Sequence, residues 1–155
     1  MTRTWLMVLL FETASTPGAA AATQHVRKAI AKLEISGDVD AMLTDSRGRR
    51  TGWEGHRVEE IPGCALEAEA DEIAEPTAYV LRWKGAVSGT FRLLLKARTS
   101  GNVQIMVSAI AAHGARCTKE SSDTLAARAS AEWAVHLVTG TTECKAELTR
   151  QKPPQ

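Results

Sequence analysis

Residues 79–110 read YVLRWKGAVSGTFRLLLKARTSGNVQIMVSAI, and this stretch decides the fold. Apolar side chains alternate with polar ones over residues 79–84, 91–98 and 103–110. A repeat of two residues is typical of a β-strand that buries one face. Glycine-bearing segments separate the three runs, so the pattern predicts three antiparallel strands joined as a meander. The side chains predicted to be buried here are Leu81, Leu93, Leu95, Ile105 and Val107.

The same alternation continues on both sides of this stretch. Residues 38–45 and 131–139 each alternate apolar and polar side chains, and Trp83 and Trp133 lie on predicted strands as core residues. Residues 26–35 fit both helical spacing and strand alternation, and we favour a strand because a helix there would be short and uncapped. About seven short strands separated by turns predict an all-β fold, a two-sheet antiparallel β-sandwich.

Two segments have no such pattern. Between Glu59 and Glu75 the chain holds seven acids and no Lys or Arg, so residues 65–76 are predicted to be a solvated loop. Residues 141–155 end in Lys-Pro-Pro-Gln and are predicted to be a flexible C-terminal tail. The expected β-sandwich domain therefore spans residues 23–140.

The N-terminal segment has the three parts of an export signal. Arg3 supplies a positive charge, residues 5–11 form an apolar run, and alanines fill residues 19–22. We expect residues 1–22 to be a signal peptide that is cut near Ala22, which predicts a periplasmic or secreted protein. Because Glu12 ends the apolar run early, a buried N-terminal strand or helix is the alternative. The run is too short for a membrane span, which needs about 20 apolar residues.

Composition excludes some classes of function. The chain has 155 residues with 19 Lys+Arg, 18 Asp+Glu, 44% hydrophobic and 24% charged residues, values typical of a globular protein. A formal net charge of +1 gives no electrostatic case for nucleic acid as a partner. The sequence has neither a phosphate-binding glycine loop nor a nucleophile elbow. We therefore predict a protein that is not an enzyme and needs no cofactor.

One segment resembles a known group of proteins. TDSRGRRTG at 44–52, EIPG at 60–63 and YVLRWKGAVSGTFRLLLKA at 79–97 match patterns of exported bacterial β-sandwich domains, which are immunoglobulin-like and mostly uncharacterised. The resemblance covers roughly residues 27–139, and Ser46 stands where the family pattern has Pro. It implies export and an immunoglobulin-like sandwich, and it carries no catalytic residue.

The chain has three cysteines, Cys64, Cys117 and Cys144, without a Cys-x-x-Cys motif. In an exported chain they predict one disulfide and one spare thiol. All three pairings are open. We favour Cys64–Cys117, because Cys64 belongs to the segment that carries the resemblance and Cys144 lies near the predicted tail.

A basic hairpin is the best candidate for a binding site. It holds Arg47, Arg49, Arg50, Trp53 and Arg57. These residues have two interpretations: a patch for an anionic glycan or an acidic protein surface with the tryptophan as stacking platform, or a hairpin whose charges pair with the acidic run. We favour internal pairing.

Metal and catalytic interpretations have weak support. The four histidines have no ligand spacing, and Asp38, Asp40 and Asp45 do not form one converging loop, so no metal site is predicted. The sequence thus predicts a non-enzymatic, exported β-sandwich that acts as an interaction or structural module. Its expected partner is an unknown protein or glycan in the cell envelope. The alternatives are a carbohydrate-binding module that uses the basic hairpin and, less favoured, a small exported hydrolase.

Overall fold

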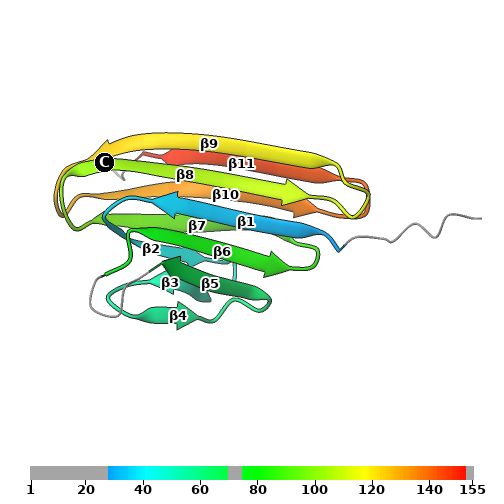
Figure 1. The fold of residues 1–155 in the computed structure, drawn as a ribbon, viewed down its shortest axis with the longest axis horizontal. Coiled ribbons are helices and arrows are strands. Elements are labelled where there is room, and N and C mark those ends of the chain that lie inside the picture. Colours follow the sequence, from blue (N-terminus) through cyan, green and yellow to red (C-terminus); the bar gives the residue numbers. More distant parts are fainter. Residues whose placement is uncertain (1–27, 70–74, 153–155) are drawn as a thin grey trace, which may run out of the picture.

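The computed structural model describes residues 28–69 and 75–152, and Figure 1 shows their arrangement. The expected signal peptide, residues 1–22, lies outside the described residues. All regular elements of the described residues are β-strands. They are β1 Ile30–Ser36, β2 Val39–Thr44, β3 Arg50–Trp53, β4 Arg57–Glu59, β5 Cys64–Glu69, β6 Ala78–Lys84, β7 Ser88–Ala97, β8 Gly101–Ile110, β9 Arg116–Leu125, β10 Ser130–Thr139 and β11 Cys144–Gln151.

The strands form two antiparallel sheets that pack face to face. The five-stranded sheet has the order β5-β6-β1-β8-β9, and the six-stranded sheet has the order β11-β10-β7-β2-β3-β4. The prediction of a two-sheet antiparallel β-sandwich is confirmed. The five side chains predicted to be buried are at most 1% exposed, and Trp83 and Trp133 also belong to the core. The ambiguous N-terminal segment contains a strand, β1, in agreement with the favoured interpretation.

The predicted meander is wrong, although its three strands exist. β6 pairs with β1 and β5, β7 pairs with β2 and β10, and β8 pairs with β1 and β9. Consecutive strands of this stretch therefore lie in opposite sheets. A strand that buries one face has the same alternation in either sheet, so periodicity cannot distinguish a hairpin from a crossover.

Two segments without a strand pattern nevertheless form strands. Part of the predicted acidic loop is β5, which pairs with β6 along its whole length. Most of the predicted C-terminal tail is β11, which pairs with β10 from Cys144 to Gln151, so the sandwich extends beyond residue 140. Both are edge strands, and an edge strand tolerates polar side chains because little of it is covered.

The two ends of the sandwich are closed by different contacts. At one end β9 lies near β11, where a disulfide joins Cys117 to Cys144 and Arg150 pairs with Asp123 at 2.9 Å. At the other end β4 of the six-stranded sheet lies near β5 of the five-stranded sheet. The contacts at both ends tie one sheet to the other.

Candidate functional site

The turn of the basic hairpin is held by one carboxylate. Asp45 Oδ1 accepts hydrogen bonds from the backbone N–H groups of Arg47 and Arg49, both at 2.9 Å. Its Oδ2 accepts the Nε–H of Arg49 at 2.8 Å. An aspartate that binds the backbone ahead of it closes a tight turn, as the sequence predicts. Asp45 and Arg49 are therefore used to shape the turn between β2 and β3.

Two further arginines of the hairpin also bind within the molecule. Arg50 lies 3.6 Å from a carboxylate oxygen of Glu54, and its backbone N–H donates to Glu60 at 2.9 Å. Arg57 Nη1 donates to the carbonyl oxygen of Leu66 at 2.7 Å. Of the hairpin's four arginines, only Arg47 has no ion pair among the described residues. The hairpin therefore presents few free positive charges to a ligand.

Trp53 of the hairpin is only partly exposed. It lies on the same side of β3 as Thr51, which is fully buried, and the indole packs against the hydrophobic core. Its Nε1 is enclosed, without a hydrogen-bond partner among the described residues. A sugar-binding tryptophan needs an exposed ring face, whereas Trp53 is half-buried and packs its indole against the core.

The acidic run supplies partners to basic side chains. Arg57 lies 3.4 Å from Glu59, and Arg82 lies 3.1 Å from Glu67. Glu75, at the other end of the run, pairs with Arg98 at 2.9 Å. These pairs agree with internal pairing as the favoured interpretation, although only one of the three arginines belongs to the hairpin.

Arg98 forms a cluster that the sequence did not reveal. Its side chain, 15% exposed, donates to Asp38 at 2.7 Å, to Glu75 at 2.9 Å and to the carbonyl oxygen of Pro76 at 2.5 Å. Asp40 lies 3.6 Å from the same guanidinium group. The cluster ties the end of β7 to the β1–β2 turn and to the start of β6. Because 60 residues separate Arg98 from Asp38, no local spacing could have indicated this contact.

The two aspartates of this cluster have opposite pKa shifts. A hydrogen bond from the Thr99 hydroxyl is the largest contribution that lowers the pKa of Asp38, and Arg98 contributes further. Burial raises the pKa of Asp40. Asp45 lies beyond the opposite end of β2, so the three aspartates do not converge. Among the described residues no group of three His, Cys, Asp or Glu side chains is placed to hold a metal ion.

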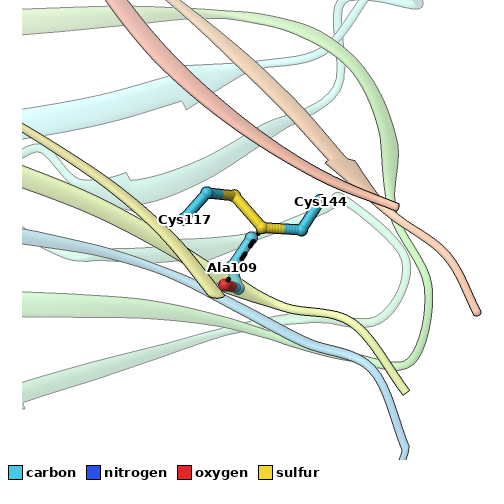
Figure 2. The surroundings of a disulfide bond; sticks show 3 residues. All are labelled: Ala109, Cys117 and Cys144. Carbon is cyan, nitrogen blue, oxygen red and sulfur yellow. Dashed lines mark hydrogen bonds between the residues drawn. A yellow bond between two sulfur atoms is a disulfide. The ribbon is translucent and has the colours of Figure 1, made fainter. Parts of the chain in front are cut away.

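The cysteines pair differently from the favoured prediction. Figure 2 shows Cys117 of β9 bonded to Cys144 of β11, with their Cα atoms 6.0 Å apart. Cys64 is a buried free thiol on β5. β5 and β9 are the two edges of the five-stranded sheet, four strand spacings or about 19 Å apart, so Cys64 cannot reach Cys117. Burial raises the pKa of Cys64 to about 12, which makes this thiol unreactive.

One contact bears on the hydrolase interpretation. The Thr90 hydroxyl lies 2.9 Å from His136 Nδ1 on the outer face of the six-stranded sheet. Thr90 also lines a groove of about 510 Å³ beside the β2–β3 turn. Glu147 stands opposite His136 on β11, but its carboxylate pairs with Lys145 at 3.2 Å. In the part of the chain that the structure describes, no carboxylate binds His136, as the orienting group of a catalytic histidine would.

The edge strand β9 is the main surface feature that the sequence did not reveal. Its residues RCTKESSDTL are exposed or half-buried except for Leu125. The segment follows a glycine turn and is rich in Thr and Ser, but charges on both faces mask the strand alternation. It lies at the border of the molecule in Figure 1.

None of the described residues belongs to a helix long and apolar enough to cross a membrane. No protein-family model, no curated protein and no solved structure matches this chain.

Proposed function

We propose that this chain is an exported, non-enzymatic β-sandwich that acts as an interaction or structural module in the cell envelope. The proposal includes the immunoglobulin-like character and the kinship with exported bacterial domains that the sequence motifs imply. It also includes cleavage near Ala22, with a periplasmic or secreted mature protein.

The inter-sheet disulfide carries this proposal. Disulfides persist in oxidising compartments and are rare in the cytosol, where thiols are kept reduced. Here the bond joins edge strands of opposite sheets, Cys117 of β9 to Cys144 of β11. A covalent link between the two layers suits a module that must keep its shape outside the cell.

The basic hairpin supports an interaction or structural role over the carbohydrate-binding alternative. Most of its arginines are bound within the molecule, and Trp53 packs against the core. A glycan would have to displace these contacts before it could bind.

The experiment compares the full chain with a variant that lacks residues 2–22, both expressed in a bacterial host. Cells are treated with a membrane-permeable thiol reagent before fractionation. We expect the full chain outside the cytoplasm with Cys117 and Cys144 protected, and the shortened chain in the cytoplasm with these thiols modified. Cytoplasmic, reduced full chain would overturn the proposal of export.

A further inference from the structure

The two ends of the sandwich differ in how their strand edges are protected. At the β4–β5 end, both backbone groups of Leu66 are bound by side chains: Arg57 donates to its oxygen at 2.7 Å, and Glu59 accepts its N–H at 2.8 Å. β4 itself has only three residues. At the opposite end β9 has ten residues, and it pairs with β8 alone. The β4–β5 end is therefore guarded, whereas the other end has two open strand edges, β9 with ten residues and β11 with eight.

The hydrogen-bond pattern shows which backbone groups of β9 face outward. Ala111 N–H donates to Ala115 oxygen at 2.8 Å, which makes these residues a hydrogen-bonded pair at the start of the β8–β9 hairpin. Such pairs alternate along an antiparallel ladder, so the odd-numbered residues of β9 bond to β8. The even-numbered residues then direct N–H and C=O away from the sheet. In agreement, the Thr124 N–H is bound by the side chain of Asp123 instead, at 2.9 Å.

The side chains of β9 carry complementary charges on one face. Lys119 and Asp123 lie four residues apart on the side that faces the other sheet. Lys119 is exposed and has no ion pair among the described residues. Asp123 pairs with Arg150. A charged side chain on the inward face of an edge strand discourages pairing with most strands, because its charge would be buried without a partner.

We propose that β9 pairs with β9 of a second copy of this chain, forming a continuous ten-stranded sheet. This inference rests on the proposed interaction role and names the partner. A two-fold axis perpendicular to the sheet leaves each face on its own side, so residues of the same face oppose each other. With the axis at Ser121, Lys119 of each copy lies opposite Asp123 of the other, and Thr118 lies opposite Thr124.

Neighbouring registers do not match the charges. An axis at Glu120 would place the two Glu120 side chains directly opposite each other, and like charges in this position are destabilising. An axis at Ser122 would place Lys119 opposite Leu125. Only the register centred on Ser121 satisfies the inward lysine, so the same residue that excludes other strands selects this partner. It also places the outward backbone groups of Glu120 and Ser122 opposite each other as hydrogen-bonded pairs.

The test is sedimentation velocity of the oxidised chain over a concentration series up to about 1 mM, because an interface of one strand pair is small and a weak dimer is expected. Lys119→Asp alone and Asp123→Lys alone should each raise the dimer dissociation constant about tenfold or more, since each change creates two like-charge pairs. An equimolar mixture of the two variants should recover the dimer, because every pair is then matched across the interface. Lys145→Asp, on the other long edge strand, should leave association unchanged.

Far-ultraviolet circular dichroism checks that each variant is folded. Because Asp123→Lys also removes the pair with Arg150, Ser122→Pro is a second test. Its N–H faces outward, so proline should spare the monomer and block dimerisation. A wild type that is monomeric throughout, or a dimer that survives both Lys119→Asp and Ser122→Pro, would overturn the inference. A monomer that is nevertheless exported would leave the proposed function standing.

Discussion

At the residue scale, Gly52 is the described glycine at which an added Cβ would meet the closest neighbour. Its φ is +155°, and a Cβ built there would overlap the backbone oxygen of Ala41 on the neighbouring strand. Gly52→Ala should therefore lower the free energy of unfolding by about 2 kcal/mol or more, because backbone must move to relieve the overlap. Gly101→Ala, where nothing lies within 4 Å and φ is not positive, should change it by less than about 0.5 kcal/mol. Chemical denaturation measures both, and equal effects would contradict this account of Gly52.

The hydrogen bond between Thr99 and Asp38 gives a second test at this scale. It is the largest contribution that holds the pKa of Asp38 below its ordinary value of 3.8. A carboxyl group with a lowered pKa stabilises the fold above pH 3.8, and that stabilisation is lost as the pH falls through the lowered value. Thr99→Val should raise this pKa, measured by carbon NMR of the carboxyl groups. The variant should have a lower free energy of unfolding than the parent. This difference should be largest near neutral pH and should shrink in acid.

Thr149→Val is the matched control, because Thr149 is exposed on β11, far from Asp38 in the sheet order. An Asp38 pKa that does not respond to Thr99→Val would show that the hydroxyl does not set it.

Single residues were predictable from the sequence where burial decides their role. The alternation identified the core of β6, β7 and β8 because one face of each strand is covered. The contacts of Arg98 and the pairing of Cys117 were not predictable, since both depend on which distant segments of the chain the fold brings together. Cys64 is the free thiol, and not Cys144, because β5 lies at the edge of the five-stranded sheet opposite to β9, which carries Cys117.

At the element scale, the predictable strands are those with one covered face. β2, β6, β7, β8 and β10 all lie within the sheets, and each was predicted within a few residues. β9 and β11 were missed because edge strands carry charges on both faces, and β5 was hidden in an acidic segment. Which strands pair was not predictable, because short connections cross between the sheets as readily as they turn within one.

The disulfide between β9 and β11 gives a prediction for these elements. It closes a separation of 27 residues, so replacing both Cys117 and Cys144 by Ser should lower the free energy of unfolding by about 3–4 kcal/mol in the loop-entropy model. Urea denaturation of the oxidised chain and of the variant measures the loss. Cys64→Ala serves as control and should preserve the disulfide. Equal stability of the double variant and the parent would contradict a structural role for the bond.

The edge of β5, where side chains of β4 bind the backbone of Leu66, gives another prediction. Glu59→Ala removes the acceptor of the Leu66 N–H, and a partly buried donor that loses its partner costs about 1 kcal/mol. Glu54→Ala removes only an exposed pair with Arg50 and should cost less than about 0.5 kcal/mol. Hydrogen exchange of the Leu66 amide should accelerate in the first variant alone. A slow amide in Glu59→Ala would mean that another group guards this edge.

At the scale of the whole molecule, the two sheets are joined at both ends, and the edge strands β9 and β11 stay unpaired on their outer sides. The disulfide and the Asp123–Arg150 pair link the sheets at the β9–β11 end, and side chains of β4 bind β5 at the other. Because the hairpin's arginines are mostly bound internally, the outward backbone groups of β9 are the feature best placed for association. This distribution is consistent with the proposed role as an interaction module.

The most direct test of this account is intact-mass and fragmentation spectrometry of the protein purified from its native host without reduction. The account predicts a chain that begins near Thr23, a Cys117–Cys144 cross-link, and a Cys64 thiol that reacts only after unfolding. A chain that begins at Met1 or Thr2 with all three cysteines reduced would contradict it.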